Sequence, residues 1–193
     1  MWMRDTKEAN HMKPERLIHT IGLNLQRGAL SRGAYLKKKK IFAQMGDYVR
    51  FQPRIVPLYP ELIKFHNNIM VGSGVRFVTH DAVHSVLNRM NIGEFPEMIG
   101  CIEVMDNVFI GADSTIMPNV RIGKNVIIGA GSLVSKDCED NSIYAGVPAR
   151  KIGNFDDFVA KRLARDYASV AKNQSITEAE KANAWDRFHR NRD

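Results

Sequence analysis

The residues best suited to chemistry lie in the short stretch THDAVH, which spans residues 79–84. Imidazole titrates near neutrality, so His80 suits a general base that takes a proton from a hydroxyl or an amine. Position alone also fits a structural or an exposed histidine. His84 could orient His80, contact a substrate or lie on a loop surface. No cysteine or serine is obviously paired with a base, which favours a reaction without a covalent intermediate.

A second set of chemically suitable residues is basic. Lys136, Arg150 and Lys151 form a patch that suits phosphate groups. The net charge of +7 would allow nucleic acid, an anionic membrane or a polyphosphate ligand as partner. No nucleic-acid-binding motif accompanies the charge, and the run Lys37–Lys40 is typical of a solvated helix face. We therefore expect no nucleic-acid partner.

The element that must position these residues has a period of six. Neither a helix nor a flat strand explains that period, whereas a parallel β-helix does, with three hexads to each turn of a triangular prism. The large aliphatic residue of each hexad is expected inside the prism, the small residue near a corner, and glycine where the backbone bends. The aliphatic series is Met98, Val104, Ile110, Ile116, Ile122, Ile128 and Val134, with Phe65, Val71 and Phe77 upstream. Four positions after each aliphatic residue come Ile102, Val108, Ser114, Val120, Val126, Ser132 and Cys138.

The hexad register breaks once by this reading, between Phe77 and Met98, so residues 81–97 are predicted to leave the prism as a loop insertion. Loops that interrupt a rigid scaffold often carry function. Helical patterns flank the repeats, over residues 14–45, from about 155 with an apolar stripe to Tyr167, and from a Thr177–Glu180 capping box to about 189. We predict three segments: helical residues 1–48, a β-helix over 49–147 and a helical extension over 148–193.

Composition favours an ordinary globular protein. Hydrophobic residues make up 44% and charged residues 25% of the 193 residues. The two cysteines provide no disulfide or metal framework. No apolar run is long enough to span a membrane, and the N-terminal residues lack the apolar core of a signal peptide. A cytoplasmic location is therefore expected.

Three stretches resemble the hexapeptide-repeat acyltransferases, and especially the galactoside and maltose O-acetyltransferase branch: FVTHD, FIGADSTIMPNVRIGKNVIIGAGSLVSKD and AGVPARKIG. The resemblance covers about residues 65–153. It implies a mainly β protein with a left-handed parallel β-helix, assembled as a homotrimer with active sites between subunits. It also implies transfer of an acetyl group from acetyl-coenzyme A, without a metal, to a hydroxyl of a sugar or polysaccharide precursor.

The resemblance assigns roles around the reacting groups. His80 matches the catalytic base and is followed by Asp81, where the galactoside branch has proline. Ala112 matches a residue whose backbone N–H stabilises the oxyanion, a role that does not depend on the side chain. Phe109 stands where that branch has a tryptophan against the cofactor. Asp81 and His84 are expected to contact the acceptor.

The remaining assignments concern coenzyme A. Ala130 matches a position that lines the pantetheine channel, and Ser135 and Lys136 match polar contacts to the cofactor. Arg150 matches a basic residue near the phosphate end. A second basic position of the branch falls on a glycine here, and we expect Lys151 to take its place.

Other functions fit parts of the sequence. Within the same chemistry, the acceptor could be an antibiotic or a nucleotide-linked amino sugar. A metal-dependent hydratase resembling the γ-class carbonic anhydrases would need three zinc-binding histidines, but the spacing of His66, His80 and His84 does not resemble that class. A catalytically silent trimeric scaffold is a third reading, against which His80 and the basic patch argue.

Overall fold

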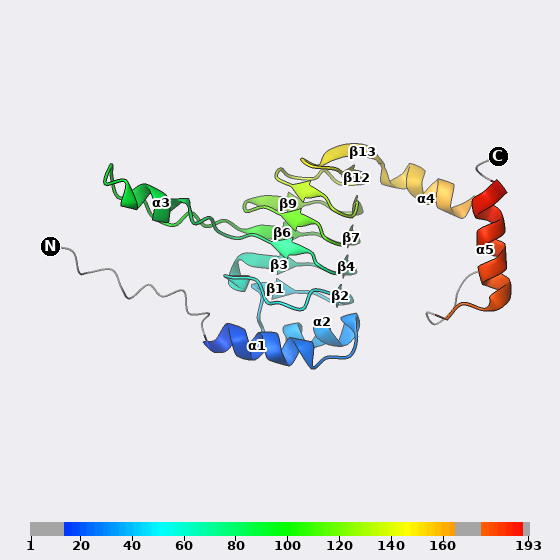
Figure 1. The fold of residues 1–193 in the computed structure, drawn as a ribbon, viewed down its shortest axis with the longest axis horizontal. Coiled ribbons are helices and arrows are strands. Elements are labelled where there is room, and N and C mark those ends of the chain that lie inside the picture. The colour runs from blue at the N-terminus through cyan, green and yellow to red at the C-terminus, as the bar shows by residue number, and fades with distance from the viewer. Residues whose placement is uncertain (1–13, 165–174, 191–193) are drawn as a thin grey trace. The chain divides into compact units, whose positions relative to one another are not determined.

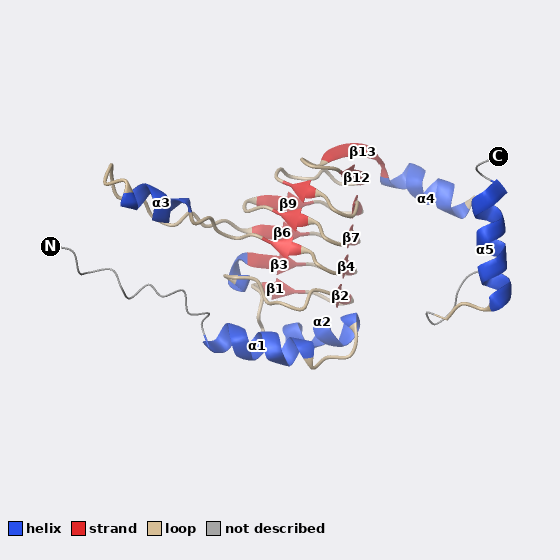
Figure 2. Ribbon diagram, viewed as in Figure 1, coloured by secondary structure: helices blue, strands red, loops and turns tan. Residues whose placement is uncertain are grey.

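The computed structural model describes residues 14–164 and 175–190, and Figures 1 and 2 show their helices and strands. The chain divides into two compact units, Met1–Asp157 and Phe158–Asp193. The first unit is mainly β, in agreement with the fold class predicted from the hexads. No described helix has the length and apolar character needed to cross a membrane.

Short strands stack into three parallel sheets, and each of the three complete turns of the coil adds one strand to each sheet. The first sheet contains β1 (Gln44–Met45), β3 (Ile63–Phe65), β6 (Ile102–Val104) and β9 (Val120–Ile122). The second contains β2 (Val49–Phe51), β4 (Ile69–Val71), β7 (Val108–Ile110), β10 (Val126–Ile128) and β12 (Ser142–Ala145). The third contains β5 (Arg76–Phe77), β8 (Thr115–Ile116) and β11 (Leu133–Val134). A 3₁₀ turn, η1 (Pro60–Leu62), leads into β3.

The coil repeats every 18 residues in its regular part, where Val108 pairs with Val126. The preceding turn is longer, because Ile69 pairs with Val108 at a separation of 39 residues. The additional residues of this longer turn are the predicted insertion. The turns at the two ends also depart from 18, since Val49 pairs with Ile69 and Val126 with Ser142. The prediction of one register break was therefore wrong, because the terminal coils also adjust their length.

The interior of the prism is filled by both hexad positions. The aliphatic residues from Val104 to Val134 and the residues four positions further on, from Ile102 to Cys138, are all at most 4% exposed. Met98 is 62% exposed, which corrects its assignment to the aliphatic series. Its carbonyl accepts a hydrogen bond from the Asp81 N–H (2.9 Å), so Met98 pairs with the insertion instead of continuing the wall.

Asparagine forms the corner between the first and second sheets. Asn68, Asn107, Asn125 and Asn141 have φ values of 54° to 61°, a left-handed conformation that asparagine tolerates better than most residues. Their side chains form a ladder, in which the Nδ2 of each asparagine donates to the Oδ1 of the next asparagine in this series, at 2.8, 2.9 and 2.7 Å. Gly111 serves a different purpose from the predicted bend, because a Cβ there would collide with the backbone of Ala130.

Helices precede the coil. The sequence pattern over residues 14–45 forms two helices instead of one, α1 (Pro14–Asn24) and α2 (Ala29–Lys38). Gly28 separates them as the N-cap of α2, where its N–H donates to Ser31 Oγ (3.0 Å). Leu23 and Leu36 are fully buried and anchor the two helices.

The C-terminal segment begins with β13 (Arg150–Asn154), which pairs antiparallel with β12. Asn154 Oδ1 then caps α4 (Phe155–Leu163) by accepting from the Asp156 N–H (2.8 Å), and the helix begins where the sequence pattern predicted it. The capping box before α5 (Glu178–Arg190) is also confirmed, because Thr177 N–H donates to Glu180 Oε2 (2.7 Å) and Glu180 N–H donates to Thr177 Oγ1 (3.2 Å). Tyr167 of the predicted apolar stripe lies outside the described residues.

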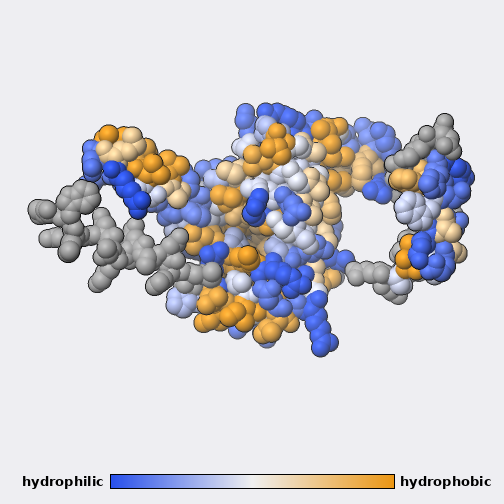
Figure 3. All heavy atoms as spheres, in the orientation of Figure 1, coloured by the Kyte–Doolittle hydropathy of each residue, from blue (hydrophilic) through white to orange (hydrophobic). Residues whose placement is uncertain are grey.

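The predicted insertion leaves and rejoins the coil as a paired stem. His80 forms an antiparallel bridge with Ile99, and the Gly100 N–H donates to the Thr79 carbonyl (2.8 Å). Its tip carries a helix that the sequence did not predict, α3 (Val83–Arg89), which projects from the coil in Figure 1. One side of the tip is apolar and appears orange in Figure 3, next to hydrophilic residues in blue. Its side chains that are more than half exposed include Val83, Val86, Met90 and Ile92.

Candidate active site

His80 lies at the corner between the third and first sheets, where the insertion begins. Alternation along the strand turns Phe77 and Thr79 into the core and leaves His80 facing outward. Thr79 is fully buried, and its Oγ1 donates to the Leu58 carbonyl (2.6 Å). The neighbouring residue therefore fixes the backbone that carries the imidazole.

The imidazole of His80 is in contact with an aromatic ring, and one of its nitrogens is shielded from water without a hydrogen bond. The Tyr59 ring meets it edge-on, with ring centroids 5.7 Å apart. Tyr59 Oη donates to Glu97 Oε2 (2.8 Å), and this hydrogen bond raises the pKa of the phenol. The Nδ1 atom of His80 is shielded from water and has no hydrogen-bond partner among the described residues. A group outside this part of the chain can therefore complete its bonding.

Asp81 and His84 belong to the insertion. Asp81 Oδ1 accepts from the Val83 N–H (3.0 Å) ahead of α3, so its carboxylate shapes the turn into that helix. His84 lies on α3, and its Nδ1 also lacks a partner among the described residues. Neither side chain lines the groove that reaches His80.

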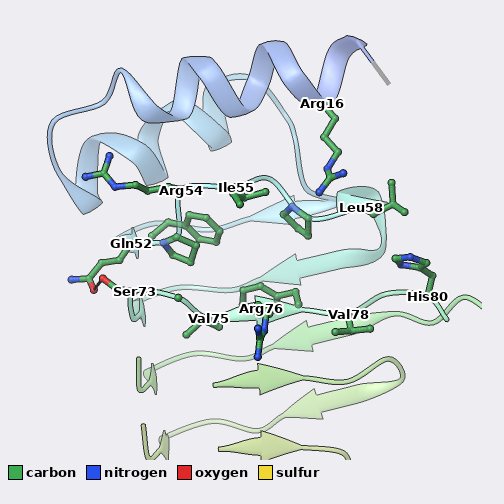
Figure 4. Close-up of a pocket in the computed structure, with 15 residues that line it drawn as sticks. Arg16, Gln52, Arg54, Ile55, Leu58, Ser73, Val75, Arg76, Val78 and His80 are labelled. Carbon is green, nitrogen blue, oxygen red and sulfur yellow. Dashed lines mark hydrogen bonds between the residues drawn. The ribbon is translucent and has the colours of Figure 1, made fainter. Parts of the chain in front are cut away.

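A groove of about 650 Å³ ends at His80, and we call it the His80 groove. One wall comes from residues 51–58 and the other from residues 73–80, with Arg16 of α1 above (Figure 4). Sequence reasoning missed this groove, because its walls come from separate turns of the coil and share no motif. The alternation that turns Arg76, Val78 and His80 outward was the available signal for one wall.

Phe109, Ala112 and Ala130 gather at another place, on the second sheet and its corner with the third. Phe109 projects from β7 and is 44% exposed. Ala112 and Ala130 occupy successive coils, and the Gly131 N–H donates to the Ala112 carbonyl (2.8 Å). The Ala112 N–H itself donates no hydrogen bond within the part of the chain that the structure describes. An unused amide of this kind can bind an oxyanion.

Ser135 and Lys136 directly follow β11 and are exposed at the same corner as His80. They lie two coils further along the prism, which at about 4.8 Å per coil is roughly 10 Å. Over residues 14–164 and 175–190, Lys136 forms no ion pair. Both residues are therefore available to a ligand that runs along this corner.

Arg150 and Lys151 lie on β13, at the end of the second sheet. Lys151 Nζ is 2.8 Å from Glu139 Oε2, and this bond raises the pKa of the ammonium. The Arg150 guanidinium donates to the Ala149 carbonyl (3.0 Å) and meets no carboxylate in the described residues. Of the two, Arg150 is the cation that is free to bind an anion.

The predicted site residues thus form two groups on one chain. His80, Ser135 and Lys136 lie at the corner between the third and first sheets. Phe109 lies on the second sheet, and Ala112 lies at the corner between the second and third sheets. One copy does not bring the imidazole of His80 to the amide of Ala112.

The three histidines considered for a metal do not gather either. His66 Nε2 lies 3.1 Å from Glu103 Oε1 on the first sheet, and Arg121 binds the other oxygen of that carboxylate at 2.8 Å. No group of three or more His, Cys, Asp or Glu side chains is arranged to hold a metal ion within the described ranges.

Comparison with known proteins agrees with the repeat. The family model "Bacterial transferase hexapeptide (six repeats)" matches residues 102–136. Protein CapG of Staphylococcus aureus is 35% identical over 132 residues, which cover 66% of this chain and 74% of that protein. Galactoside O-acetyltransferase of Escherichia coli is 36% identical over 122 residues, or 62% of this chain and 57% of the relative. The chain thus spans little more than half the length of that enzyme.

Solved structures show the same fold. A galactoside acetyltransferase in complex with coenzyme A has a TM-score of 0.56 at 28% identity, over 91% of this chain and 94% of that one. A maltose O-acetyltransferase from Clostridium difficile has a TM-score of 0.52 at 24% identity, over 72% and 84% of the two chains.

Proposed function

We propose that this chain, which belongs to the bacterial hexapeptide-repeat transferase family, moves an acetyl group from acetyl-coenzyme A to a hydroxyl of a sugar or polysaccharide precursor. The observations that carry the proposal are the imidazole of His80 at the end of the groove and the free N–H of Ala112. A base and an oxyanion donor are the two groups that acyl transfer to a hydroxyl needs. The named acetyltransferases among the similar proteins support the choice of acyl group.

In this reaction His80 takes the proton from the acceptor hydroxyl, whose oxygen attacks the thioester carbonyl. The negative charge that develops on the carbonyl oxygen is stabilised by the Ala112 N–H. The carbon–sulfur bond then breaks, and His80 returns its proton to the departing thiolate of coenzyme A. Binding both substrates side by side makes the encounter intramolecular, which lowers the barrier by several kcal/mol.

The assembly that fits this reaction is a homotrimer of left-handed coils with an active site between each pair of subunits. His80 of one copy then faces Ala112 and Phe109 of the next, which removes the separation found within a single chain. The exposed apolar tip of the insertion supports the same arrangement, because a neighbouring subunit would cover it. Asp81 and His84 would reach the acceptor from that tip.

The coenzyme A path follows from the order of the coils. The thioester lies at His80, the pantetheine passes Ala130, and Ser135 and Lys136 contact it from the corner of His80. Four steps along the second sheet separate β4 from β13, or about 19 Å. The phosphate end of the cofactor would then bind Arg150. Lys151 would also bind a phosphate after its ion pair with Glu139 breaks.

The first experiment compares His80→Ala with a matched control, His66→Gln, whose histidine lies on the same coil but on the first sheet. Thioester cleavage is measured with acetyl-coenzyme A and a panel of sugars, and coenzyme A binding by calorimetry. Loss of a general base predicts a fall in turnover of about a hundredfold or more for His80→Ala, with coenzyme A affinity unchanged. Turnover of His80→Ala close to that of the wild type would refute the assignment.

The second experiment tests the site between subunits by complementation. Ala130→Trp blocks the pantetheine path on one side of the site, and His80→Ala removes the base on the other. Each variant alone is expected to be inactive. In trimers mixed from equal amounts, about a quarter of the sites combine an intact His80 with an intact Ala130, so activity returns to that extent. No recovery in verified mixed trimers would contradict an active site shared between copies.

A further inference from the structure

The His80 groove is positively charged along its length. Arg16, Arg54 and Arg76 line it together with His80, and no aspartate or glutamate does. Figure 4 shows the three arginines spread around the groove, with Arg16 reaching down toward Leu58 on the side of His80. Such a groove attracts an anion before any contact forms.

The three guanidinium groups are not neutralised by the protein. Arg16 Nε donates to the Val56 carbonyl (2.8 Å), Arg54 Nη1 to Asn24 Oδ1 (3.5 Å), and Arg76 Nη2 to Thr115 Oγ1 (3.3 Å). All three acceptors are uncharged. Among the described residues, none of these arginines forms an ion pair with a carboxylate.

The carboxylates nearest to the groove are already committed or lie at its ends. Glu97 accepts the hydroxyl of Tyr59 beside His80, and Asp113 packs against Gly74 at the other end. Neither lines the groove. The arginines consequently keep their positive charge, and each retains N–H donors for the carboxylate or phosphate of a ligand.

The spacing of these residues sets the size of the ligand. Arg76 precedes His80 by four residues on an extended segment, which corresponds to about 13 Å. That distance exceeds one pyranose ring. The apolar side chains of Val78 and Leu58 also line the groove and suit the hydrocarbon faces of sugar rings.

We propose that the acceptor is an anionic glycan of at least two units, bound with its reactive hydroxyl at His80 and its carboxylate or phosphate at Arg76, while Arg54 adds to the positive field of the groove. This inference rests on the proposed acetyl transfer and names its substrate class. The phosphates of coenzyme A do not explain the groove, because their proposed site at Arg150 is four steps of the second sheet away.

The test measures binding separately from turnover. Calorimetry on the whole protein compares the binding of a galacturonate trisaccharide with that of its neutral galactose counterpart. The binding of uridine diphosphate galactose is measured as well, as a ligand that carries phosphate in place of carboxylate. The variants are Arg76→Gln and Arg54→Gln, and Arg50→Gln is the matched control, since Arg50 is exposed on β2 outside the groove.

We expect the wild type to bind at least one anionic ligand about tenfold more tightly than the neutral sugar, and each groove variant to lose most of that preference. Coenzyme A affinity and the Arg50→Gln control should stay unchanged. Preference for the trisaccharide identifies a carboxylate, and preference for the nucleotide sugar identifies a phosphate.

Equal binding of neutral and anionic ligands would overturn the inference and leave acetyl transfer standing. Weaker coenzyme A binding in Arg76→Gln would also overturn it, because the arginines would then serve the cofactor. If anionic ligands bind as expected but no acceptor releases thiol from acetyl-coenzyme A, the proposed acetyl transfer fails while recognition of the anionic glycan stands.

Discussion

The asparagine ladder offers a test of what stabilises the coil, and Asn125 is the position to change. Its side chain makes two hydrogen bonds, accepting from Asn107 at 2.9 Å and donating to Asn141 at 2.7 Å. Each is worth about 0.5–1.5 kcal/mol net. The backbone of Asn125 has a φ of 54°, which costs alanine about 1 kcal/mol more than asparagine or glycine. Asn125→Ala should therefore lower the free energy of unfolding by about 2–4 kcal/mol.

Two further variants separate the contributions. Asn125→Gly loses the same two hydrogen bonds without the backbone strain, so it should be about 1 kcal/mol more stable than Asn125→Ala. Asn141→Gly loses the single hydrogen bond from Asn125 and should cost about half as much as Asn125→Gly.

The assay is urea unfolding followed by circular dichroism, at one protein concentration because assembly shifts apparent stability. If unfolding is irreversible, unfolding rates replace equilibrium values. A glycine variant no more stable than the alanine variant would refute the role of the positive φ. A cost below about 0.5 kcal/mol for Asn125→Ala would refute the ladder as a source of stability.

Two other predictions concern titration and reactivity. The hydrogen bond from His66 and the nearby Arg121 lower the pKa of Glu103. Its ionised form therefore stabilises the fold at pH values above the ordinary pKa of 4.5, and this stability is lost as the pH falls through the lowered folded-state pKa. Glu103→Gln should flatten the dependence of the unfolding free energy on pH in the acid range, and an unchanged slope would contradict this. Burial raises the pKa of Cys138 to about 12, whereas Cys101 is exposed. Iodoacetamide should therefore modify one thiol rapidly in the folded protein, and equal rates at both would show that Cys138 is accessible.

The sequence predicted the coil because the six-residue period of its apolar residues equals the number of residues on one side of the prism. Residues such as Ile110 and Ile128 occupy equivalent places on successive turns of the coil, 18 positions apart, and both are fully buried. Departures came where contacts are not periodic. Met98 follows the spacing but pairs with Asp81 across the stem, and Gly28 divides a region whose apolar pattern looked continuous.

The candidate site was predictable in part for the same reason. The end of the regular wall identified His80 as a residue with an unusual position, and the family resemblance identified Ala112. Which groups meet was not predictable, because a corner of the prism is defined only when the coils are stacked. The arginines of the His80 groove were missed because the two walls that carry them are separate in the sequence. The hydrogen bond from Thr79 to Leu58, 21 residues apart, brings these walls together, and such tertiary packing leaves no local sequence pattern.

The paired stem that carries the insertion closes at Thr79 and Gly100, and the coils on either side of it keep their strand register. Lengthening, shortening or replacing residues beyond that closure leaves the hydrogen bonding between turns intact. The insertion can therefore vary in length and sequence while the stacking of the coil, which holds His80 and Ala112 in place, is kept.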